Sequence, residues 1–194
     1  MTVVDNIGIR LAKNAHLHIF HILISGSNVI TGCAVDLAGE DSTVNINSGY
    51  IVKNDENLDI NYVVRHRGRH TDTKINVAGV LRDKATKTFR GSIDFINGCA
   101  ESKGDEREDV LMMNPGVENK TIPLILCAEE DVEGTHGASI GKISDDVLFY
   151  FETRGVDEKD VQELMAKSRI DAVISKISNS AVRDRLKNIL TPEE

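Results

Sequence analysis

The sequence predicts a mainly β protein that ends in a short helical tail. Before residue 143, apolar residues recur at every second position in several segments, which is typical of strands with one buried face. After residue 143, the apolar residues recur at helical spacing instead. We therefore expect a β unit over residues 1–143 and a helical segment over residues 144–194, a length that suits one compact domain.

Three segments show the strand alternation most clearly. Their apolar residues share one face: Val44 and Ile46; Leu58, Ile60, Tyr62 and Val64; and Phe89, Ile93 and Phe95 with Gly91. Turn signals rich in Gly, Asn, Asp and Ser separate the segments, and no long helical pattern lies between them, which argues against a doubly wound α/β sheet. Many short strands fit a sandwich, a barrel or a solenoid, and no fixed-period repeat selects one of these.

The tail carries several helix signals. Ser144 followed by two acids is typical of a helix N-cap, and Gly155 of a C-cap. Asp157 is a cap for a second helix. A third apolar stripe follows at helical spacing and consists of Ile170, Val173, Ile174 and Ile177. Asn179 or Ser180 caps a last helix, whose apolar residues are Val182, Leu186, Ile189 and Leu190.

Charge and cysteine content exclude several classes of protein. The net charge is −8, and residues 98–194 hold 21 acidic against 12 basic side chains. Nucleic-acid affinity comes mainly from basic side chains and base stacking, so with 4% aromatic residues no nucleic-acid partner is expected. No apolar stretch suits a membrane span, and no secretory signal is visible. Three cysteines without Cys-x-x-Cys spacing indicate neither a disulfide framework nor a structural zinc site, and we expect a cytoplasmic protein.

Histidine and basic residues gather in two places. His16, His18 and His21 fall in an expected strand, where His16 and His18 share one face and His21 lies opposite, so we favour a partly exposed strand over a metal site. Residues 65–70 are densely basic, and we interpret them as a solvated loop or a charged edge strand rather than an anion site.

Two acidic stretches lie further along the chain. Residues 101–109 lack the order of an EF-hand loop, and we expect them to form a mobile, solvated loop. Residues 127–137 combine the thiol of Cys127, four carboxylates and the imidazole of His136. These ligand types suit iron or another transition metal, although Cys127 also fits a buried core thiol.

A series of short landmarks runs from His66 to Gly155 in a fixed order. They are HRGRHT at 66–71, GVL at 79–81, FRGSI at 89–93, LMM at 111–113, TIPL at 121–124, HGASIG at 136–141, LFY at 148–150 and TRG at 153–155. In order and spacing they resemble the core domain of the SufB/SufD family of iron–sulfur cluster assembly proteins. The resemblance implies a right-handed parallel β-helix with C-terminal helices.

The resemblance also implies partners and a function. Family members dock the ABC-type ATPase SufC through the helical tail, and pair with themselves or a homologous subunit along the β-helix. The complex is a non-catalytic scaffold on which iron–sulfur clusters are built. A transient iron–sulfur cluster is the one cofactor implied, and no tightly bound group is expected.

Departures from the family pattern select one branch. Val117 stands near the position of a SufB-type cysteine, and Thr135 and Gly137 stand where SufB-type proteins carry Glu. His136-Gly137-Ala138 matches the SufD type, in which some members have a cysteine at the position of Gly134. The chain therefore resembles SufD. His136 is the candidate iron or cluster ligand, and Cys127 a candidate second cluster ligand.

Two alternatives remain beside the cluster scaffold. One is a β-helical interaction module without cluster chemistry, because the SufB-type ligands are missing. The other is a carbohydrate-active β-helix enzyme, which the small number of aromatic residues argues against.

Overall fold

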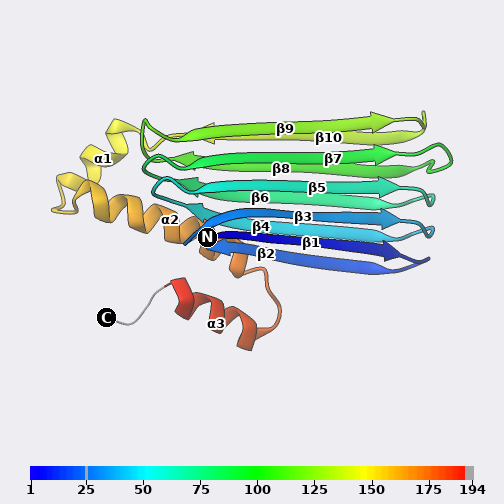
Figure 1. The fold of residues 1–194 in the computed structure, drawn as a ribbon, viewed down its shortest axis with the longest axis horizontal. Helices are drawn as coiled ribbons and strands as arrows, with labels where there is room; N and C mark the ends of the chain where they lie inside the picture. The colour runs from blue at the N-terminus through cyan, green and yellow to red at the C-terminus, as the bar shows by residue number, and fades with distance from the viewer. Residues whose placement is uncertain (25, 191–194) are drawn as a thin grey trace.

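In a computed structural model, which describes residues 1–24 and 26–190, the chain forms a parallel β-solenoid followed by three helices (Figure 1). The mainly β fold with C-terminal helices and the parallel β-helix are confirmed. No helix in the described ranges is both long and apolar enough to cross a membrane. The strands are β1 (Thr2–Leu11), β2 (His16–Ile24), β3 (Asn28–Leu37), β4 (Thr43–Val52), β5 (Asn57–His66), β6 (Asp72–Leu81), β7 (Thr86–Phe95), β8 (Ser102–Met112), β9 (Glu118–Cys127) and β10 (Val132–Gly141). The helices are α1 (Asp145–Glu152), α2 (Glu158–Ile174) and α3 (Ser180–Leu190).

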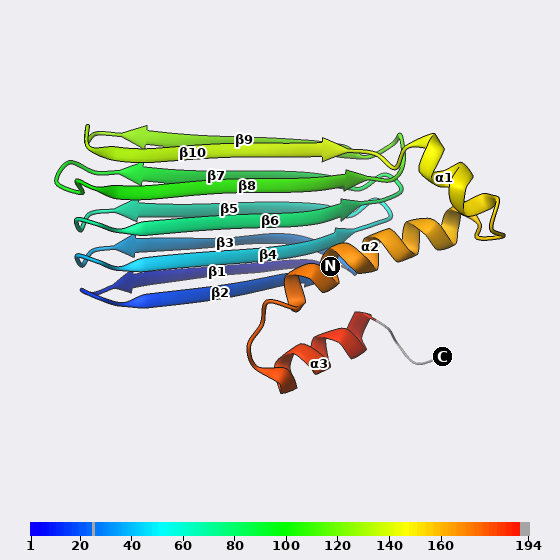
Figure 2. The same cartoon turned by 180° about the vertical axis from the view of Figure 1, so that it is seen from behind.

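The strands build two facing five-stranded sheets. The odd sheet has the order β1-β3-β5-β7-β9 and the even sheet β10-β8-β6-β4-β2, and the neighbouring pairs are parallel. Each coil of the solenoid therefore contributes one strand to each sheet, which Figure 2 shows from behind. Successive strands of one sheet begin between 26 and 32 residues apart. This variation in coil length hides the repeat from a search for a fixed period.

The core lies between the two sheets and follows the predicted alternation. Leu58, Ile60, Tyr62 and Val64 on β5 are at most 2% exposed. Phe89 on β7 is fully buried, as are its inward neighbours Ile93 and Phe95. Parallel pairing places equivalent positions of successive coils above one another, so these side chains form continuous apolar stacks along the solenoid.

Side chains of one coil cap the turns of the preceding coil. The backbone N–H of Asn54 donates to Asp83 Oδ2 at 2.8 Å, and the N–H of Asp83 donates to Asn114 Oδ1 at 2.7 Å. Asn54 and Asp83 have positive φ, a conformation that Asn and Asp tolerate better than most residues. These turns explain why short polar residues separate the strands.

The expected N-caps are confirmed, whereas the C-cap of α1 is Thr153 and not Gly155, which follows two residues later with a positive φ. The number of helices also needs one correction. Ser144 accepts from the N–H of Val147, and Asp157 from the N–H of Asp160. Asn179 Oδ1 accepts from the N–H of Val182 at the start of α3. The two apolar stripes that follow Asp157 belong to one continuous helix, α2, because no capping or breaking residue interrupts residues 158–174.

Helix α2 lies on the outer face of the even sheet (Figures 1 and 2). Gly49 on β4 permits the close approach, since a Cβ there would lie 3.4 Å from Ile170 Cδ1 and 3.5 Å from Val173 Cβ. An ion pair of 2.5 Å between Arg169 Nη1 and Asp109 Oδ2 ties the helix to β8. The helical tail is thus packed against the solenoid along much of α2.

Two of the sequence interpretations were wrong in part. Residues 101–109 were expected to be a mobile loop, but all except Glu101 belong to β8. Their inward positions are buried and their outward positions are charged, so the strand has the period of two without an apolar face. In the basic stretch, His66 is fully buried at the end of β5, an interior strand. Residues 67–71 form the turn that follows, in which Arg67, Arg69 and His70 are exposed and Thr71 is buried.

The predicted arrangement of the first three histidines is confirmed. His16 and His18 on β2 are exposed, and His21 points inward, where its Nδ1 lies 2.8 Å from the Tyr62 hydroxyl. Burial lowers the pKa of His21.

Candidate functional site at the open end of the solenoid

Strands β9 and β10 end the two sheets, and we call this edge of the molecule the open end (Figure 1). Each strand pairs on one side only within the described residues. Edge strands present unpaired backbone N–H and C=O groups, which makes them natural places for another chain to pair. Both candidate ligands of the sequence analysis lie on these two strands.

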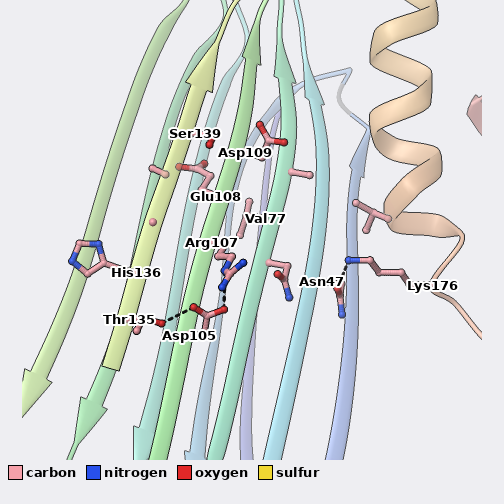
Figure 3. A pocket seen from close by; sticks show the side chains of 15 residues that line it. Asn47, Val77, Asp105, Arg107, Glu108, Asp109, Thr135, His136, Ser139 and Lys176 are labelled. Atoms are coloured by element: carbon pink, nitrogen blue, oxygen red, sulfur yellow. Dashed lines mark hydrogen bonds and ion pairs between the residues drawn. The ribbon is translucent and has the colours of Figure 1, made fainter. Parts of the chain in front are cut away.

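His136 lies on β10 and faces the inner side of the last coil. Its register partner is Glu106 on β8, whose side chain is inside the solenoid. Parallel strands in register point equivalent side chains to the same face. Figure 3 shows the imidazole on the opposite side of β10 from the Thr135 side chain. The residue is nevertheless exposed, because no further coil covers it within the described chain.

Cys127 is the last residue of β9 and is also exposed, which excludes a core thiol. The structure does not bring it to His136. Gly134 faces Ile125 across the last coil, since a Cβ on Gly134 would lie 3.0 Å from Ile125 Cγ2. His136 therefore faces Pro123, and Cys127 lies four residues away along β9, or about 13 Å at ordinary strand rise.

The cysteines and histidines do not form a complete ligand set. No group of three or more His, Cys, Asp or Glu residues that could hold a metal ion occurs within residues 1–24 and 26–190. Cys33 and Cys99 are buried, and burial raises the pKa of both thiols. A cluster at the open end would therefore need further ligands from a second protein.

Charged side chains are buried directly beneath the open end. Lys87 on β7 and Glu108 on β8 are an ion pair whose side chains are 0% and 1% exposed. The Tyr50 hydroxyl donates to Glu108 Oε1 at 3.2 Å, and Thr121 on β9 donates to Glu108 Oε2 at 2.5 Å. Burial lowers the pKa of Lys87, and the neighbouring carboxylate acts against this effect. These contacts satisfy Glu108 and connect the fourth coil to the last one.

Glu106 lies beside this network but outside it. It is 3% exposed, and burial, with the like charge of Glu108, raises its pKa to about 7. Its carboxyl group reaches across the coil to Gly91, where a Cβ would lie 2.0 Å from Glu106 Oε2. Gly91 thus provides the space that the carboxyl group occupies.

A groove of about 630 Å³ runs along the outer face of the even sheet beside the C-terminal end of α2 (Figure 3). Thr135 Oγ1 donates to Asp105 Oδ1 at 2.6 Å, and Arg107 Nε lies 3.0 Å from Asp105 Oδ2. At the far side, Lys176 Nζ donates to Asn47 Oδ1 at 3.3 Å. Residues 135–139 of β10, His136 included, also line the groove, although the His136 ring lies on the opposite side of the strand from Thr135.

Sequence reasoning missed Lys87, Glu106 and Glu108. One signal could have revealed them. Ser102, Gly104, Glu106, Glu108 and Val110 occupy every second position of a segment between two turns. Charged residues at both inward and outward positions concealed the alternation, because hydrophobic periodicity detects only apolar faces.

The positions that distinguish the two family branches have clear places in the structure. Val117 is partly buried and packs against the core. Gly134 lies on the same inward face as His136, where Phe95 and Ile125 leave little room for a larger side chain. A Cβ on Gly137 would meet no atom within 4 Å, so nothing in this chain requires glycine there for space.

Comparison with known proteins agrees with the fold. The family model described as "SUF system FeS cluster assembly, SufBD core domain" matches residues 1–169. The iron-sulfur cluster assembly protein SufD of Escherichia coli (strain K12) is 26% identical over 155 residues, which cover 80% of this chain and 37% of that protein. SufD of Bacillus subtilis (strain 168) is 20% identical over 168 residues, covering 87% of this chain and 38% of that protein.

A plant relative matches over a shorter range. The chloroplastic SufBD family protein ABCI8 of Arabidopsis thaliana is 27% identical over 143 residues, covering 70% of this chain and 26% of that protein. The chain thus spans between about a quarter and two fifths of the length of these three relatives. The predicted resemblance to the SufB/SufD family, and to SufD within it, is confirmed. Since the family model covers most of its length, the chain belongs to the SufBD core family of the SUF iron–sulfur cluster assembly system.

Proposed function

We propose that this chain is a non-catalytic scaffold subunit of a SUF-type complex in the cytoplasm. It docks a SufC-type ABC ATPase through its helical tail and pairs with itself or a homologous subunit at the open end. The observation that carries the proposal is the match to the SufBD core over residues 1–169. The two bacterial SufD relatives are iron–sulfur cluster assembly proteins.

The open end supports pairing between subunits. Both sheets end there in strands of ten residues, so a second β-solenoid has two long edges to continue. Ile122, Leu124 and Leu126 on the outer side of β9 are each about half exposed. An apolar row beside unpaired backbone groups is typical of a surface that another protein covers.

The helical tail supports docking of a partner. Helix α1 buries none of its residues, and Phe149 and Tyr150 on it are 67% and 52% exposed. The Arg154 guanidinium lies 3.6 Å from the centre of the Tyr150 ring and also donates to the Tyr150 carbonyl at 3.0 Å. This contact fixes one aromatic side chain in place. Rigid aromatic and arginine side chains are the residue types that most often dominate binding energy at interfaces.

Copurification with the ATPase tests the docking proposal. The full chain is coexpressed with the SufC-type ATPase of the same organism, alone and with the homologous subunit. We expect the two proteins to copurify, and the double substitution Phe149→Ser/Tyr150→Ser to abolish copurification. Lys167→Ser on α2 serves as the control for an exposed tail residue. Absence of copurification for the unmodified chain under both conditions would contradict the proposal.

His136 and Cys127 remain the proposed ligands of a transient cluster. His136 is exposed on the inner side of the open end, where a pairing subunit would bring its own ligands. Replacement of a thiolate by an imidazole raises the potential of a cluster, which suits a scaffold that transfers its product. His136→Ala in the reconstituted complex should lower iron and sulfide content, whereas unchanged content would remove His136 from the mechanism.

A β-helical interaction module without cluster chemistry is the second candidate. The separation of Cys127 from His136 favours it, as does the lack of a three-ligand group in the described residues. Such a module would copurify with its partners and stay colourless after anaerobic reconstitution. Colour from a thiolate-ligated cluster that is lost on substitution of His136 would exclude this candidate.

A further inference from the structure

The turns that lead from odd to even strands stack along one side of the solenoid, and their charges alternate (Figure 1). Lys13 in the first turn forms an ion pair with Glu40 in the second. Arg69 Nη2 in the third turn lies 2.8 Å from Glu101 Oε1 in the fourth. Opposite charges on neighbouring strands stabilise a sheet, and here they join neighbouring coils.

The fifth turn, between β9 and β10, breaks this alternation. Glu130 and Asp131 follow the acidic fourth turn, and both are exposed without an ion pair within residues 1–24 and 26–190. Lys142, which directly follows β10, is likewise exposed and unpaired in those ranges. At ordinary strand rise it lies about 35 Å from Asp131, so these charges cannot meet within one molecule.

Two copies can place their open ends together about a two-fold axis in two ways. In the first arrangement, β9 pairs with β9 of the second copy and β10 pairs with β10. In the second arrangement, β9 pairs with β10 of the second copy. The paired strands are antiparallel in both, because the axis of the first reverses each strand and because β9 and β10 run in opposite directions (Figures 1 and 2).

The charges distinguish these two arrangements. The first places the acidic turn of one copy beside the end of β10 in the other, where Lys142 lies. The second places the two acidic turns beside each other, and like charges on facing strands are destabilising. The half-exposed Ile122 and Leu124 favour the same choice, because they lie beside the same apolar row of the second copy in the first arrangement only.

We propose that Lys142 and the acidic turn with Glu130 and Asp131 select a second copy of this chain as the pairing partner, in the first arrangement. The inference rests on the proposed function, since pairing at the open end is part of it. Both halves of the charge match lie on one edge, so this edge is complementary to itself. Each dimer contains two equivalent contacts between Lys142 and the acidic turn of the other copy.

Sedimentation of the full chain at micromolar concentration, without any ATPase, tests the proposal by a charge swap. We expect the unmodified chain to form a dimer. Lys142→Glu, and separately Glu130→Lys/Asp131→Lys, should each weaken the dimer by about 10- to 100-fold, because repulsion replaces attraction at both contacts. An equimolar mixture of the two variants should form a heterodimer about as stable as the parent dimer, since both contacts are then restored.

A matched control separates this effect from a general effect of charge. Lys74→Glu reverses an exposed charge on β6, an interior strand of the even sheet, and should leave dimerisation unchanged. The turn variant keeps Glu129, because that side chain accepts from the backbone N–H of Gly98 at 2.9 Å and holds the turn. Thermal unfolding verifies that each variant is folded.

Three results would overturn the proposal. They are an unmodified chain that stays monomeric, a Lys142→Glu dimer as stable as the parent dimer, and a mixture that forms no heterodimer. A chain that is monomeric alone but pairs with the homologous subunit would overturn this inference and leave the proposed function intact. A dimer that passes the charge swap but does not copurify with the ATPase would support this inference and contradict the docking proposal.

Discussion

Protonation of His66 should destabilise the folded chain by an amount that the structure defines. The ring is fully buried between strands, with Nδ1 2.7 Å from Thr71 Oγ1 and Nε2 2.9 Å from Thr73 Oγ1. It also stacks on Phe95, with ring centres 4.6 Å apart. Burial disfavours the charged imidazolium and lowers the pKa of His66 from 6.5 to about 4.

The direction of the pH effect follows from proton binding. Between pH 4 and 6.5 the unfolded chain binds more protons at His66 than the folded chain, so stability rises with pH. The contribution of the neutral, buried His66 ring to folding stability is fully present above pH 6.5 and is lost as the pH falls toward 4. At about 1.4 kcal/mol for each pKa unit, the loss amounts to about 3 kcal/mol.

Denaturant unfolding of the unmodified chain and of His66→Gln provides the assay. The variant loses packing and hydrogen bonds at every pH, but it does not titrate. The stability advantage of the unmodified chain should therefore shrink by about 2–3 kcal/mol between about pH 7.5 and about pH 4.5. His18→Gln, at an exposed position, is the control and should show no such change. A constant difference between the chain and His66→Gln across this range would refute the reasoning.

Other substitutions test the core and the seam between tail and solenoid. Lys87→Met should destabilise the chain by about 3–5 kcal/mol in denaturant unfolding, because it leaves Glu108 buried and unpaired, and Lys87→Met/Glu108→Met should recover most of this loss. Equal losses in the single and double variants would contradict the pairing. Gly79→Ala should lower the thermal midpoint, since the new Cβ would lie 2.0 Å from the Tyr50 ring; an unchanged midpoint would contradict this close packing. Ile170→Ala should cost about 2–5 kcal/mol and increase hydrogen exchange in α2, whereas a stability and exchange rate like those of the parent chain would show that α2 is not anchored there.

Much of the solenoid could be predicted because its inward positions are apolar. Leu58, Ile60 and Phe89 lie on the buried face that the alternation of apolar residues predicts. Ser144 and Asp157 are the N-caps of α1 and α2, as expected. The choice of a solenoid over a sandwich or a barrel came from the resemblance alone. Coil lengths that vary by a few residues leave no fixed period, and the stacking of coils depends on contacts between distant residues.

The site was harder to predict because its chemistry is inside the solenoid. Glu106 and Glu108 look like solvated acids in the sequence, and only the register with β6 and β10 shows that they face inward. His66 was hidden in the same way by its arginine neighbours. Charged residues are almost never fully buried unless they are paired, so composition alone assigns them to the surface. The pairing of Lys87 with Glu108 depends on two strands whose apposition no local pattern reveals.

Anaerobic reconstitution of the complex tests the central claim most directly. The full chain, purified with its SufC-type ATPase and, where present, the homologous subunit, is supplied with iron and sulfide and assayed for transfer to an apo-acceptor. We predict visible absorption from a labile cluster, transfer to the acceptor, and loss of both in His136→Ala but not in His18→Ala. A complex that stays colourless, or that transfers clusters equally well without this chain, would contradict the role of scaffold subunit.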